Sequence, residues 1–215
     1  MDALIDVTPL YIEGFLQTLA LLLLAGSGAF VVGVLIAALR ISPVPVMRGF
    51  ATAYTELLRN VPLLLVLFFC AFVLPLLGVQ LDFFVLAVIG LTAYTSPFVA
   101  EAVRSGINGV HVGQAEAARS LGFAFGQTIS LIVLPQAARM VVPPLINVFI
   151  ALTKNTSVAG AFFVFELFGA TTRGTRDHGD QVILMLLYAA ALYLVITVPL
   201  GLIAGAIEKK VRVLR

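Results

Sequence analysis

GFLQTLALLLLAGSGAFVVGVLIAAL, residues 14–39, is the stretch that decides the fold class, because it is apolar and carries no charged side chain. An α-helix needs about 20 apolar residues to cross a bilayer. The rest of the chain has the same character, since 61% of its residues are hydrophobic, 11% are charged and the mean hydropathy is +1.10. Soluble domains are about a quarter charged. We therefore predict an all-α membrane protein.

Further apolar stretches follow this first one along the chain. Residues 51–60 are more polar and are predicted to form the cytoplasmic foot of the second span. The fourth stretch is longer than one straight span and contains polar residues, so we expect it to be interrupted. The predicted spans are residues 14–39, about 61–77, about 83–103, about 141–169 and about 182–207.

Basic side chains predict the orientation, because positive charge favours the cytoplasmic side of a membrane. They occur after the first and third spans and in the C-terminal tail, whereas the N-terminal tail and residues 78–82 have none. The loop with Arg173 and Arg176 is the exception, and the nearby Asp177 and Asp180 weaken it. We predict five transmembrane helices, with the N-terminus outside and the C-terminus cytoplasmic. The net charge of +2 does not suggest a nucleic-acid partner.

The longest polar interruption covers residues 105–138, between the third and fourth spans. A short cytoplasmic helix is predicted there, and glycine favours the left-handed conformation that ends such a helix. Small alanine side chains permit close approach by a partner, and the alternative is an ordinary helix lying on the membrane surface. The helix and its stop are formed by Gln114, Ala115, Glu116, Ala117, Ala118, Arg119, Ser120, Leu121 and Gly122.

The spacing of Glu116-Ala117-Ala118, Gly122, Ile132 and Leu134-Pro135 resembles the EAA loop of bacterial ATP-binding-cassette (ABC) importer permeases. Three longer segments resemble the polar amino-acid uptake branch of that family, and the chain looks like glutamate importer permeases of actinobacteria. Val61 departs from the branch, which often has threonine there. These segments are YTELLRNVPLLLVLFF (54–69), AYTSPFVAEAVRSGINGVHVGQAEAARSLG (93–122) and ALTKNTSVAG (151–160).

The resemblance implies one transmembrane domain, residues 1–215, that serves as the permease subunit of an importer for glutamate or another polar amino acid. It implies a dimer of ATPase subunits that bind Mg-ATP, a paralogous second permease in a heterodimer rather than a homodimer, and an extracytoplasmic substrate-binding protein. It places the chain in the bacterial cell membrane, in contact with lipid.

The chain itself is not expected to be an enzyme or to hold a cofactor. It has no G-x-x-x-x-G-K-[ST] phosphate loop, so ATP hydrolysis is expected on a separate subunit. His111 and His178 are isolated, so no metal site is predicted, and the only cysteine, Cys70, lies in an apolar run. No catalytic residues are predicted.

Polar side chains within the apolar stretches are candidates for a substrate path. A lysine that faces lipid costs about 2.5 kcal/mol or more. Lys154 therefore either meets a substrate carboxylate, pairs with Glu166, Glu101 or Glu56, or extends to an interface. Glu101 and Arg104 share a helix face and form either a local ion pair or a gate contact. The predicted path residues are Thr153, Lys154, Asn155, Thr156, Ser157, Glu101 and Arg104.

Two other functions are alternatives to an importer subunit. An ion-coupled secondary carrier without an ATPase would use Lys154 and Glu101 as coupling residues. It would leave the EAA spacing and the odd number of spans unexplained. An intramembrane enzyme would need a catalytic constellation, and the sequence offers no paired metal ligands and no nucleophile beside a base.

Overall fold

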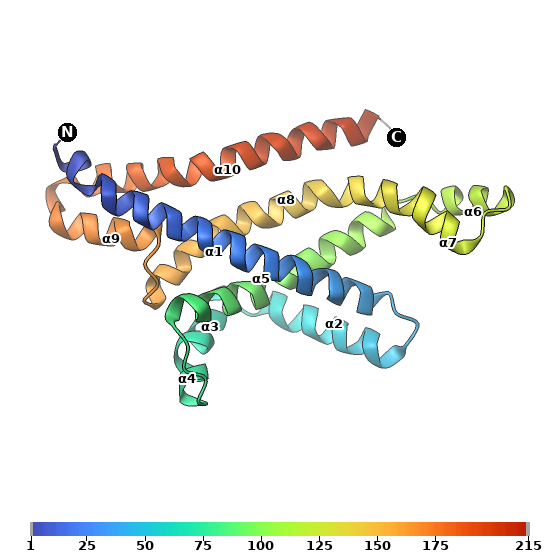
Figure 1. Cartoon of the computed structure of the whole chain (residues 1–215), viewed down its shortest axis with the longest axis horizontal. Helices are drawn as coiled ribbons and strands as arrows, with labels where there is room; N and C mark the ends of the chain where they lie inside the picture. The colour runs from blue at the N-terminus through green and yellow to red at the C-terminus, as the bar shows by residue number, and fades with distance from the viewer. Residues whose placement is uncertain (1, 214–215) are drawn as a thin grey trace.

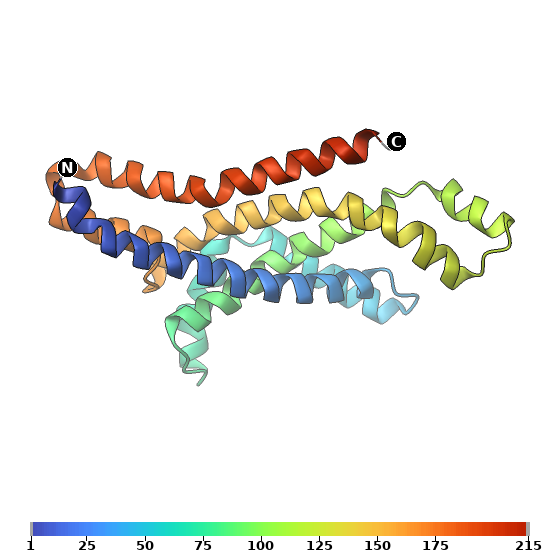
Figure 2. The same cartoon turned by 45° about the horizontal axis from the view of Figure 1, so that its top comes forward.

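The computed structural model describes residues 2–213, and every regular element within this range is helical. Four long helices run roughly along the long axis of the molecule (Figures 1 and 2). They are α1 (Asp2–Arg40), α5 (Phe83–Asn108), α8 (Leu134–Ala159) and α10 (Val182–Val213). The N-terminus lies at one end of this axis with α9 (Leu167–Asp177), and α6 (Val112–Ser120) lies at the other end (Figure 1).

The helices confirm a multi-span membrane fold, with four or five spans. Four helical segments are long and apolar enough to cross a membrane by themselves, namely Ile5–Arg40, Phe83–Asn108, Phe125–Phe162 and Gly179–Lys210. The predicted second span differs from these. Pro45–Asn60 and Leu63–Leu76 meet at a bend of 103°, and they provide a fifth span only if the bent pair is counted as one.

Small residues allow α1 to pack closely on α5, which is the most extensive helix pairing in the chain. A Cβ atom added at Gly33 would lie 2.5 Å from the Cβ atom of Val99 and 2.7 Å from the carbonyl oxygen of Ser96. Close backbone approach at small residues is a common mode of helix association in membranes. α8 also packs on α5, and α10 packs on α8. Among the four long helices, successive helices are thus packed on one another.

Two wide, π-helical turns occur in this fold, and each ends directly before a Leu-Pro pair. The first, Phe69–Val73, connects α3 (Leu63–Phe68) to α4 (Leu74–Leu76). The second, η2 (Thr128–Val133), connects α7 (Phe125–Gln127) to α8. Proline has no N–H and collides with the carbonyl four residues earlier in a regular α-helix. The wider turns let both helices continue through their prolines.

The fourth stretch is interrupted as expected, and the break lies after the polar residues 153–157. α8 continues without a break through residues 153–157 and ends at Ala159, and the break follows at Gly160–Phe163, where Phe163 has a φ of 63°. The hydroxyl groups of Thr153, Thr156 and Ser157 donate hydrogen bonds to carbonyl groups of their own helix. These polar side chains are satisfied locally, so they do not require a broken backbone.

The polar interruption is also shorter than residues 105–138. α5 extends to Asn108, and the helix that leads into α8 already begins at Phe125 instead of near residue 141. α9 was not predicted either, because its polar sequence suggested a loop. Glu166 caps the start of α9, where its side chain accepts a hydrogen bond from the Gly169 N–H group.

Candidate functional site

α6 is a short helix whose two ends are closed by specific contacts. At its start, the ring nitrogen Nδ1 of His111 accepts a hydrogen bond from the Gly113 N–H group (3.1 Å). At its end, the Gly122 and Phe123 N–H groups donate to the carbonyl groups of Arg119 (3.0 Å) and Ala118 (3.2 Å). Gly122 has a φ of +86°, which confirms that it ends the helix in the left-handed conformation. His111 is therefore the N-terminal cap of α6.

One side of α6 packs inside the protein and the other is open. Ala118 is only 5% exposed and belongs to the side that packs on η2, so it is not available to a partner, contrary to expectation. Glu116 and Ala117 are exposed, as are three large apolar side chains nearby. These are Val112, Leu121, which is 79% exposed, and Phe125. Exposed large apolar side chains beside polar ones are typical of a docking surface.

A cavity of about 430 Å³ lies between α5 and α8. Asn147 and Asn155 contribute amides to its wall, and α5 contributes Tyr94, Thr95 and Phe98. The hydroxyl oxygen of Thr95 is buried and has no hydrogen-bond partner in the described chain. The cavity thus combines aromatic surface with several uncharged polar groups, which is the usual make-up of a site for a small polar molecule. Of the predicted path residues, Asn155 lines this cavity.

Lys154 does not line the cavity between α5 and α8. It lines a second cavity of about 370 Å³ between α8 and α10, together with Ser157, Tyr193 and Thr197. Among the side chains that the structure describes, no carboxylate forms an ion pair with it. Of the three alternatives for Lys154, an ion pair with Glu166, Glu101 or Glu56 does not occur among the described residues.

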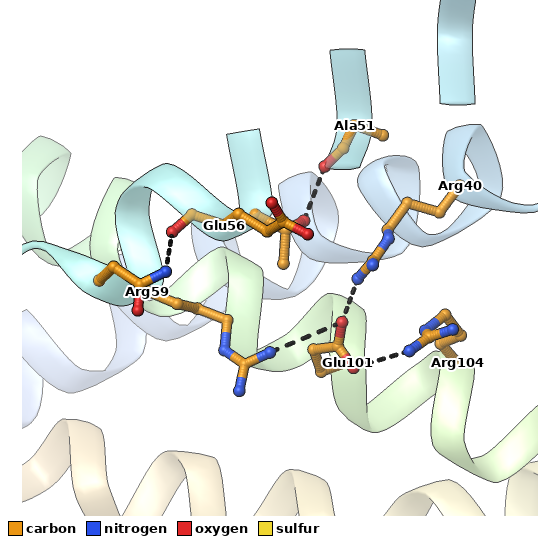
Figure 3. A network of polar contacts seen from close by, with 8 residues as sticks. Arg40, Ala51, Glu56, Arg59, Glu101 and Arg104 are labelled. Carbon is orange, nitrogen blue, oxygen red and sulfur yellow. Dashed lines mark hydrogen bonds and ion pairs between the residues drawn. The ribbon is translucent and has the colours of Figure 1, made fainter. Parts of the chain in front are cut away.

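Glu101 is the centre of a cluster of four charged side chains, which we call the Glu101 cluster and which Figure 3 shows. Arg104, on the same helix, lies 3.4 Å from its Oε2 atom, as the sequence predicted for a local pair. Arg40, at the end of α1, donates a hydrogen bond to Oε1, and Arg59, at the end of α2, lies 3.7 Å from the same atom. The contacts of Arg40 and Arg59 join three helices and were not visible from sequence spacing.

Glu166 is a fully buried carboxylate at the start of α9, between the spans that end at Phe162 and begin at Gly179. It accepts hydrogen bonds from the Gly169 N–H group (2.9 Å), the Tyr193 hydroxyl (2.8 Å) and the Thr18 hydroxyl (3.5 Å). Burial raises the pKa of this carboxyl above its ordinary value, and the hydrogen bonds oppose that rise. Glu166 thus connects α9 to α1 and α10 and has a structural role.

Comparison with known proteins identifies the family. Residues 29–213 match the family described as the inner membrane component of binding-protein-dependent transport systems. The chain is 40% identical to the probable glutamine ABC transporter permease protein GlnM of Bacillus subtilis, over 98% of this chain and 97% of the relative. It is also 40% identical to the glutamate transport system permease protein GluC of Corynebacterium glutamicum, over 97% and 96% of the two chains.

Solved structures agree with these relatives. A crystal structure of an amino acid ABC transporter with histidines contains a chain that superposes with a TM-score of 0.89 at 29% identity, over 96% of both chains. The MetNI methionine ABC transporter gives a TM-score of 0.74 at 19% identity, which shows the fold alone. The predicted resemblance to ABC importer permeases is confirmed, as are the membrane location and the assignment as a transport subunit rather than an enzyme. The chain belongs to the family of inner membrane components of binding-protein-dependent transport systems.

Proposed function

We propose that this chain is the permease subunit of an ATP-driven importer for glutamate or glutamine, and that α6 couples it to a separate ATPase. The relatives named for glutamine and for glutamate support this substrate class, each at 40% identity over nearly the whole chain. The observation that carries the coupling role is the outward surface of α6. The family match leaves no ground for the alternative of an ion-coupled secondary carrier.

α6 is suited to transmit movement because it is held firmly on one side and open on the other. A helix of nine residues is marginal in isolation. Its two caps and its packing on η2 stabilise it. A partner that binds Glu116, Ala117 and Leu121 would thus push on a formed helix that is joined through η2 to α8. Because Asn147 and Asn155 of α8 line the cavity, movement of α6 would reach the cavity wall.

The cavity between α5 and α8 is the part of the substrate path that we assign to this chain. Its volume of about 430 Å³ is at the small end of ligand-binding cavities in proteins, which suits a small molecule such as an amino acid. Asn155 and Thr95 supply hydrogen-bonding groups there. Lys154 lies on the face toward α10 and is available to a carboxylate outside this chain.

The remaining parts of the transporter come from other subunits. We propose an ATPase dimer that binds Mg-ATP, a paralogous permease that forms a heterodimer with this chain, and an extracytoplasmic binding protein that delivers the amino acid. We also propose that the N-terminus is outside and that α6 and the C-terminus are cytoplasmic. The basic side chains along the sequence support this orientation. The position of α6 agrees with it, because α6 lies at the end of the molecule remote from the N-terminus (Figure 2).

Co-expression tests this proposal. The chain is produced with the candidate ATPase and the paralogous permease, and affinity purification and ATP-dependent uptake into proteoliposomes are measured. We expect a stable complex that takes up glutamate or glutamine, and we expect Glu116→Lys to lose the ATPase while remaining inserted. Asp180→Lys is the matched control, because it makes the same charge change at an exposed acid in the short 3-10 turn Gly179–Gln181, which precedes α10. A normal ATPase complex with Glu116→Lys would refute the coupling role.

A further inference from the structure

The Glu101 cluster has an excess of positive charge. Three guanidinium groups, those of Arg40, Arg59 and Arg104, surround one carboxylate. The carboxylate of Glu56 is drawn nearby in Figure 3, but it is exposed and forms no ion pair with the described side chains. Arginine remains charged at any physiological pH. The cluster therefore presents a net positive field to its surroundings.

Arg59 is the member of the cluster that is least firmly held. Arg40 and Arg104 both donate hydrogen bonds to Glu101. Arg59 approaches no closer than 3.7 Å, and its side chain is 45% exposed, against 41% for Arg104 and 13% for Arg40. Its charge is therefore only partly neutralised by Glu101 and can act on another anion.

Arg59 is also the member that lies against the cavity. Its guanidinium carbon is 5.8 Å from the centre of the Phe98 ring, and Phe98 forms part of the cavity wall. The residues that line the cavity are all uncharged. The guanidinium group of Arg59 thus lies over a residue of the cavity wall, and one aromatic ring separates it from the cavity. A buried hydroxyl without a partner, that of Thr95, is available in the same wall.

We infer that Arg59 is a specificity-determining residue, whose charge favours acidic amino acids over neutral and basic ones in the cavity between α5 and α8. The inference rests on the proposed function, since it assumes that the substrate passes through this cavity. Arg59 acts through its electric field rather than by direct contact, because Phe98 stands between it and the cavity. As an order of magnitude, two unit charges about 10 Å apart at an effective dielectric constant of about 20 change a population roughly tenfold, and the partial neutralisation by Glu101 makes this the upper end of the expected effect.

Uptake of glutamate and glutamine by the complete transporter in proteoliposomes tests this. Each amino acid is supplied at a concentration that saturates the binding protein, and uptake is measured per ATP hydrolysed. We expect Arg59→Gln to lower the ratio of glutamate to glutamine uptake by up to about tenfold, and we expect Arg59→Lys to preserve most of it. Arg48→Gln is the matched control, because it removes the same charge from the same helix at a side chain that donates to the Ser42 carbonyl and takes no part in the Glu101 cluster.

A second variant covers the case in which Arg59→Gln fails to assemble. Phe98→Leu keeps every charge but removes the ring that separates Arg59 from the cavity, and we expect it to raise the ratio of glutamate to glutamine uptake. An unchanged ratio in the assembled variants, or an equal loss for both amino acids, would overturn the inference, since Arg59 would then only support the fold. A wild-type transporter that moves neither amino acid would instead refute the proposed function.

Discussion

The left-handed residue that closes α6 gives the sharpest test of the coupling helix, through Gly122→Ala. Gly122 has a φ of +86°, and a Cβ atom added there would meet nothing within 4 Å. The substitution therefore causes no collision, and its whole cost is conformational. A non-glycine residue in this conformation costs about 1–2 kcal/mol. That free energy corresponds to a factor of about 5 to 30 in an equilibrium constant.

We expect this change in the equilibrium constant to be visible first in the hydrogen exchange of the residues that cap α6. The Gly122 and Phe123 N–H groups donate the two hydrogen bonds that end α6, so their exchange with deuterium should accelerate about 5- to 30-fold. If the ATPase binds only the formed helix, its affinity should fall by up to the same factor. Hydrogen exchange followed by mass spectrometry and a titration of the purified ATPase measure the two effects.

Two neighbouring substitutions make the result specific. Gly126→Ala also adds a methyl group in open space, but Gly126 is helical, so we expect no loss. Gly122→Asn should retain much of the wild-type behaviour, because asparagine tolerates the left-handed conformation. Unchanged exchange in Gly122→Ala would refute the conformational reasoning. Faster exchange with an unchanged ATPase affinity would refute the role of α6 in coupling.

Three further predictions concern stability, each measured by thermal unfolding of the purified protein in detergent. Gly33→Ala should destabilise the α1–α5 crossing by about 1–3 kcal/mol, because the new methyl group would overlap Val99; full stability would show that the helices can separate freely. Glu166→Ala should cost about 1–3 kcal/mol by leaving the half-buried Tyr193 hydroxyl without its acceptor, and Glu166→Gln should cost less; equal losses would contradict this. Glu101→Gln should destabilise the junction of three helices, and a second change, Arg104→Gln, should recover part of the loss; additive losses would show that the charges do not interact.

Local signals in the sequence predicted the spans and α6 well. Long apolar runs marked α1, α5 and α10, and Gly122 marked the end of α6. Features that depend on distant contacts were not predictable in this way. Arg40 meets Glu101 only because α1 packs along α5, and the two residues are 61 positions apart. Polar character was also misleading, since the hydroxyl groups near Lys154 suggested a broken helix.

The wide turn η2 fixes a rotational relation between two parts of the molecule. Compared with an α-helix, such a turn contains one extra residue, which rotates everything beyond it by about 100° around the axis. η2 lies between α6 and the part of α8 that carries Asn147 and Asn155. Deleting one residue from Thr128–Val133 would turn the amides away from α5 without changing any side chain of the cavity. The number of residues in Thr128–Val133 therefore determines which face of α8 is turned toward α5.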